Sequence, residues 1–143
     1  MTRLARISRW GWISMFGLAL FFGLNSGAFA GDFAKQLHTA LAHAGYSSKS
    51  KDIKAVHLHL YHTINCLEGS KGADFNAAAG NPCKGQGNGA LNDLSGRPEV
   101  RDLVQQALSL ATTAVRIDLY KPSRRVALAV NEVLQEASRK SAQ

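Results

Sequence analysis

Apolar residues recur at intervals of three and four in four separate stretches of this chain, and this spacing restricts the chain to helical folds. Such a spacing places the apolar side chains on one face of an α-helix. The stretches cover residues 33–44, 51–67, 98–120 and 123–140. Alternating runs of β-branched residues, which would indicate strands, do not occur. We therefore predict an all-α fold, a small antiparallel four-helix bundle.

Residues typical of helix ends bound these stretches. Asp32 is suited to cap the first helix, and Gly45 is suited to end it. Pro98 fits the first turn of the third helix, which is expected to end near residue 120. Ser123 is then expected to cap the fourth helix.

The stretch from residue 69 to residue 97 has no helical period and is rich in glycine and asparagine. A connection of this length without regular structure is usually functional or disordered. Short helical turns could form around residues 77–79 or 90–94. Cys66 precedes the stretch and Cys83 lies within it, and an even cysteine count in an exported chain indicates a disulfide. A pair of thiolate metal ligands is the alternative. We predict a long, disulfide-tethered loop between the second and third helices.

Residues 1–30 have the order of features found in a cleavable secretory signal. Three arginines precede an apolar run at residues 13–24, no acidic residue occurs before Asp32, and Ala28-Phe29-Ala30 forms a small-x-small cleavage site. The apolar run is shorter than the roughly 20 residues that span a bilayer, which disfavours an uncleaved anchor. We predict a signal peptide at 1–30 and a single domain at 31–143, periplasmic or secreted, with no stable membrane span.

Composition and motifs disfavour several classes of function. The formal net charge is +7, but three of the 17 basic residues lie in the predicted signal peptide, and the others form no basic stripe. Nucleic-acid binding is therefore not expected. Both methionines, Met1 and Met15, also lie in the signal peptide, so methionine ligation of copper(I) or haem is not expected. Because no catalytic motif is present, we predict a binding protein and not an enzyme.

All five histidines lie between residues 38 and 62, and three of them, His57, His59 and His62, belong to the second predicted helix. Clustered imidazoles are typical ligands of transition metals. On a helical wheel, His59 and His62 share the outer face with Cys66, whereas His57 lies at the edge of the apolar face. A disulfide at Cys66 would draw the loop over this outer face. We predict a site for copper, zinc, nickel or iron at His59 and His62, assisted by His57 or by loop residues.

Other roles remain open for these histidines. They could be surface residues, or hydrogen-bonding partners that pin the loop in a cofactor-free envelope protein whose partner is another protein. Haem between the helices is disfavoured, because it needs two inward-facing imidazoles and only His57 approaches that position. His38 and His43 flank the buried face of the first helix on opposite sides, and they are weaker ligand candidates.

Asp118 falls on the apolar face of the third predicted helix, near its C-terminal end. A carboxylate there is disfavoured both by desolvation and by the helix dipole. Asp118 is therefore either a buried carboxylate with a partner, such as an arginine, a tyrosine hydroxyl or His57, or a residue that reaches solvent because the helix end frays.

Overall fold

The computed structural model describes residues 32–143, which are all-helical, as the sequence predicts. Its four long helices are α1 (Phe33–Lys49), α2 (Ile53–Glu68), α4 (Pro98–Ala114) and α5 (Tyr120–Ser141). A 3-10 turn, η1 (Ala77–Ala79), and a short helix, α3 (Ala90–Asp93), lie between α2 and α4. No helix within the described residues is long and apolar enough to cross a membrane. The predicted signal peptide lies outside these residues.

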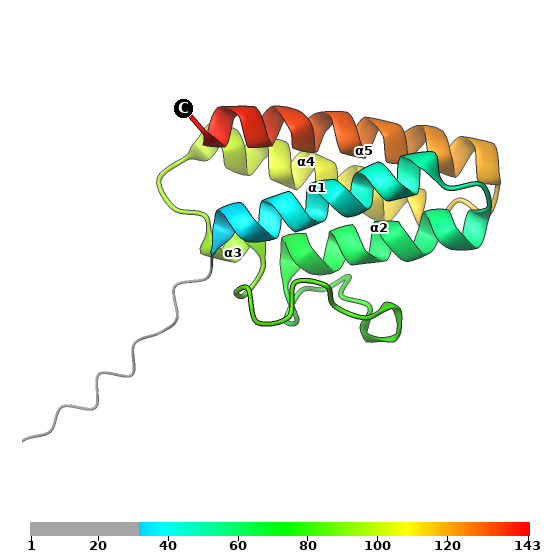
Figure 1. Cartoon of the computed structure of the whole chain (residues 1–143), viewed down its shortest axis with the longest axis horizontal. Helices are drawn as coiled ribbons and strands as arrows, with labels where there is room; N and C mark the ends of the chain where they lie inside the picture. The colour runs from blue at the N-terminus through cyan, green and yellow to red at the C-terminus, as the bar shows by residue number, and fades with distance from the viewer. Residues whose placement is uncertain (1–31) are drawn as a thin grey trace, which may run out of the picture.

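The four long helices lie side by side around one apolar core (Figure 1). α1 packs against α2 and α5, and α4 packs against the same two helices. Each long helix contributes fully buried side chains from its predicted apolar stripe, among them Leu37, Leu60, Ile64, Val104 and Leu134. Burial of each such side chain contributes roughly 1.5–3 kcal/mol, so the stripes account for most of the attraction between the helices.

α1 passes through Gly45 and ends at Lys49, so the prediction that Gly45 ends the helix is wrong. A Cβ atom built on Gly45 would lie 3.4 Å from Asn131 Oδ1 of α5, which shows how closely the two helices approach here. In the additional turn, Ser47 is buried and donates a hydrogen bond of 2.9 Å to the Val56 carbonyl of α2. These tertiary contacts outweigh the helix propensity of glycine, which costs only about 1 kcal/mol.

α4 ends at Ala114, earlier than predicted, and α5 begins at Tyr120. Ser123 does not cap the last helix but lies in its first turn, where it is buried and donates to the Ala114 carbonyl (2.9 Å). Pro122 is tolerated in this turn because the amide that it lacks would have no partner within the helix. Asp118 lies in the connection between the two helices and is exposed, because α4 has already ended. It is not a buried carboxylate.

The predicted disulfide between Cys66 and Cys83 forms and joins the segment 69–97 to the C-terminal turn of α2. Both cysteines are buried and belong to the same hydrophobic core as the apolar stripes of the long helices. The sulfur of Cys83 lies 3.9 Å from the Gln36 carbonyl oxygen of α1. Both short turns predicted within the segment are present, as η1 and α3.

Buried side-chain amides fix the path of the segment 69–97. Asn65 of α2 donates to the carbonyls of Asn76 (2.8 Å) and Gly80 (2.7 Å), and its own amide oxygen accepts from the backbone N–H of Asn76 (2.8 Å). Gln36 of α1 accepts a hydrogen bond of 2.7 Å from the backbone N–H of Gly89. These contacts hold η1 beside the outer face of α2.

Candidate metal centre

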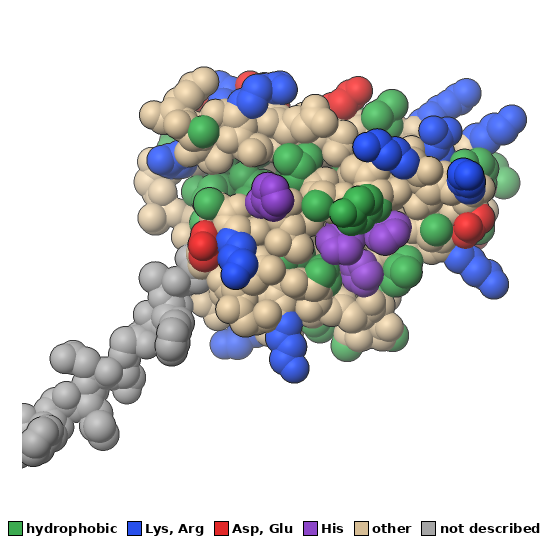
Figure 2. Space-filling view, viewed as in Figure 1, with side chains coloured by type: hydrophobic (Ala, Val, Ile, Leu, Met, Phe, Trp, Pro, Cys, Tyr) green, Lys and Arg blue, Asp and Glu red, His purple; other side chains and the backbone are tan. Residues whose placement is uncertain are grey.

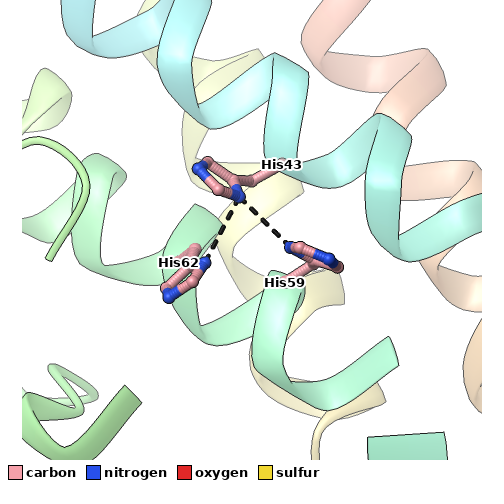
Figure 3. A group of neighbouring side chains, drawn as sticks. All are labelled: His43, His59 and His62. Atoms are coloured by element: carbon pink, nitrogen blue, oxygen red, sulfur yellow. Dashed lines mark hydrogen bonds between the residues drawn. The ribbon is translucent and has the colours of Figure 1, made fainter. Parts of the chain in front are cut away.

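Three histidine side chains meet on the outside of the α1–α2 pair (Figure 3). His43 comes from α1, and His59 and His62 come from α2, where a spacing of three places them on the same face. All three side chains are half-buried. In the space-filling view, histidine side chains gather at one place on this face of the molecule (Figure 2).

The packing of α1 on α2 determines which residues meet. Thr63 Oγ1 of α2 donates to the Ala40 carbonyl of α1 (3.3 Å), and Ser47 Oγ of α1 donates to the Val56 carbonyl of α2 (2.9 Å). These two interhelical hydrogen bonds lie on either side of His43 along the pair. Their donor side chains are fully buried, so they fix the register that brings His43 opposite the α2 histidines.

The ring nitrogens are close enough to share one ion. His43 Nδ1 lies 3.3 Å from Nδ1 of His59 and 3.3 Å from Nδ1 of His62. Two nitrogens bound tetrahedrally to zinc at roughly 2.0–2.1 Å are about 3.3–3.4 Å apart, which matches these separations. One ligand atom from each histidine lies within 4.8 Å of the others, so no pair needs to close by more than about 1.5 Å to reach the same ion.

The orientation of His62 is set by the segment 69–97. Its Nε2 lies 2.6 Å from the Ala79 carbonyl oxygen, which can only accept, so Nε2 carries a proton and donates it. A neutral ring then has its lone pair on Nδ1, the atom that faces His43. Metal-binding histidines commonly donate their second ring N–H to a carbonyl in this way, which fixes both the tautomer and the orientation of the ring.

The cluster disfavours protonation. Burial, together with the neighbouring His62 and His59, lowers the pKa of His43 from 6.5 to about 4. The pKa of His59 is lowered as well, first by burial and then by His62. Both rings are therefore neutral near pH 7, and neutral imidazole is the form that binds metal ions.

Tyr46, one helical turn after His43, covers part of the cluster. The Tyr46 ring centroid is 5.5 Å from that of His43, in an edge-on arrangement, and 5.4 Å from that of His59. Such aromatic contacts restrict the rotation of both imidazoles. The phenol itself is 55% exposed, so it screens the cluster without closing it off.

The structure brings together two of the three histidines named from the sequence. His59 and His62 belong to the cluster, whereas His57 points elsewhere and donates from Nε2 to the Ile117 carbonyl (3.1 Å). The segment 69–97 reaches His62, as predicted from the position of Cys66. Its contact is the Ala79 carbonyl, which orients the His62 ring by a hydrogen bond.

His43 is the residue that sequence reasoning did not select. Its position beside the apolar stripe of α1 follows from the sequence, but its partners depend on how α1 and α2 pack. A helical wheel of one helix gives no information about the register between two helices. A usable signal was the short connection at residues 50–52, which keeps α1 and α2 next to each other in the fold.

Comparison of the chain with family models, curated proteins and solved structures finds no match.

Proposed function

We propose that this protein is an exported binding protein for a transition metal ion, which His43, His59 and His62 hold together. The observation that carries the proposal is the convergence of three Nδ1 atoms from two helices, two pairs of them 3.3 Å apart. His62 gives a second line of support. Its Nε2 donates a hydrogen bond to the Ala79 carbonyl, as the second ring nitrogen of metal-binding histidines commonly does.

The three imidazole donors limit which metal ions the site can bind. Imidazole suits zinc, copper(II), nickel and iron(II), whereas magnesium and calcium prefer oxygen. Thiolate ligation is not available from Cys66 and Cys83, which are joined in a disulfide. Among divalent ions, copper is bound most strongly by a given set of nitrogen donors, with nickel and zinc next. We propose copper(II) or zinc as the ion.

The proposed setting is an antiparallel four-helix bundle that works in the periplasm or outside the cell. The disulfide is compatible with an oxidising compartment, and the N-terminal sequence has the features of an export signal. We propose binding and not catalysis, because the sequence contains none of the familiar catalytic motifs.

The direct test is the metal content of protein purified from the exported fraction without a histidine tag, followed by titration of the metal-free form with zinc and with copper(II). We expect about one equivalent of metal, and its loss in His43→Ala, His59→Ala and His62→Ala. His38→Ala is the matched control, since His38 is an exposed residue of α1 outside the cluster. A metal-free protein that takes up neither ion at micromolar concentration would overturn the proposal.

A second candidate function has one observation in its favour. The hydrogen bond from His62 to Ala79 pins η1 to α2, which is the role expected of these histidines in a cofactor-free envelope protein. In that case the cluster would serve stability, and His62→Ala would loosen η1 without any effect of added metal. The titration above separates the two functions.

A further inference from the structure

We propose that a metal ion at this cluster keeps one coordination position outside the protein, and that this position binds a small anion from solution. The inference rests on the proposed metal site and goes beyond it, because it names a second ligand class. Three observations support it: the number of protein donors at the cluster, the charge that these donors supply, and the access that solvent has to the cluster.

The first argument is the number of protein donors. Within residues 32–143, the histidine, cysteine, aspartate and glutamate side chains that converge here are three imidazoles, with no carboxylate or thiolate among them. The Ala79 carbonyl already accepts a hydrogen bond from His62 Nε2, and the sulfur atoms of Cys66 and Cys83 are bonded to each other. Three protein ligands with a fourth position left for an exogenous ligand is the arrangement typical of open zinc sites.

The second argument is charge. Three neutral imidazoles contribute no negative charge, so a divalent ion bound to them would retain its full +2. The ligand side chains are half-buried, and a low-dielectric setting penalises a charge that is not compensated. A fourth ligand that is anionic reduces this charge, whereas a neutral one does not. The site should therefore prefer hydroxide, a halide or a small pseudohalide such as azide.

The third argument is access. The cluster lies on the outer surface of the α1–α2 pair, where histidines are visible in the space-filling view (Figure 2). Tyr46 lies beside His43 and His59, and more than half of its surface is exposed. The cluster is therefore partly open to solvent, which gives a small anion access to the ion.

The experiment uses the full protein loaded with cobalt(II), whose visible absorption reports the coordination of a zinc-type site, and sodium azide as the probe. We expect azide to change the cobalt bands saturably, with one azide per cobalt. The same titration of the metal-free protein should give no signal. His38→Ala should behave as the wild type, because it leaves the cluster intact.

The outcomes separate the inference from the proposed function. Failure of cobalt, zinc and copper(II) to bind would overturn both. Stoichiometric cobalt binding with spectra that do not respond to saturating azide would overturn the anion site alone. If the wild type does not respond, the azide titration is repeated with Tyr46→Phe. A change of the cobalt spectrum in that variant would identify the phenol oxygen as the fourth ligand. No change would indicate that another protein donor occupies the fourth position.

Discussion

His62 is the residue in which the structural and metal-binding roles of the cluster can be separated. One of its ring nitrogens donates to the Ala79 carbonyl at 2.6 Å, and the other lies 3.3 Å from His43. A glutamine side chain carries an N–H group that can replace the first contact, but it is a poor ligand for zinc or copper.

We therefore predict that His62→Gln loses metal binding while its free energy of unfolding, measured without metal, stays near that of the wild type. His62→Ala should lose binding and also about 1 kcal/mol of stability, the usual net value of one hydrogen bond. Denaturant unfolding with and without zinc provides the measurement. Wild-type metal affinity in His62→Gln would remove His62 from the ligand set.

His43 gives the metal-free protein a predictable dependence on pH. Its pKa is about 4 in the folded protein and 6.5 ordinarily, so in this pH range the unfolded chain binds a proton that the folded protein does not. The free energy of unfolding should therefore rise with pH from about 4 to 6.5, and fall as the protein is acidified through the same range. His59, whose pKa is lowered too, acts in the same direction.

The measurement is denaturant unfolding at several pH values in the presence of a chelator. Two carboxyl groups also have shifted pKa values: burial raises the pKa of Glu68, and hydrogen bonds from Asn88 and Gln36 outweigh burial and lower the pKa of Asp93. His43→Gln therefore serves as the reference, and its stability should depend less steeply on pH. Equal slopes for the two proteins would contradict the low pKa of His43.

At the scale of elements, the segment 69–97 depends on a few anchors to α2 and α1. The disulfide from Cys66 to Cys83 and the hydrogen bonds of Asn65 join it to α2, and the hydrogen bond from Gly89 to Gln36 joins it to α1. Within the segment, Gly69, at φ +74°, packs against Asn88 so tightly that no Cβ fits. The anchors place η1 where it orients His62.

Removing the disulfide should therefore affect the fold more than the metal site. We expect the double substitution of Cys66→Ala and Cys83→Ala to lower the free energy of unfolding by about 3 kcal/mol, the chain-entropy value for a loop of this size. Amide exchange in η1 should become faster, while metal affinity should fall less than in a variant that lacks a ligand. Unchanged stability and exchange would show that the hydrogen bonds alone hold the segment.

The helices show which features of the fold a local sequence pattern predicts and which it does not. The apolar stripes predicted the existence and the buried faces of all four long helices. Helix ends were less predictable, because α1 continues through Gly45 to a turn in which Ser47 donates to Val56 of α2, and because Ser123 donates to Ala114 and does not cap α5. Both ends depend on contacts between helices that a local pattern does not contain.

At the scale of the whole molecule, only part of the candidate site could be predicted, because contacts between helices are not contained in a local sequence pattern. His59 and His62 lie on one face of one helix, so their proximity follows from their spacing alone. His43 joins them only because α1 and α2 pack in one particular register, set by Thr63 and Ser47. His57 is close in sequence to the other two α2 histidines, yet in the fold it bonds to the Ile117 carbonyl in the connection between α4 and α5.

The measurement that tests the central claim most directly is a comparison of metal affinity between His43→Ala and His57→Ala, by calorimetric titration with zinc and copper(II). The two residues differ in that only His43 belongs to the cluster. We predict that His43→Ala weakens binding by more than about tenfold, since loss of even an outer partner of a metal ligand costs 10–100-fold, and that His57→Ala binds as the wild type. Undiminished binding in His43→Ala, or a loss confined to His57→Ala, would contradict the assignment of the three-histidine site.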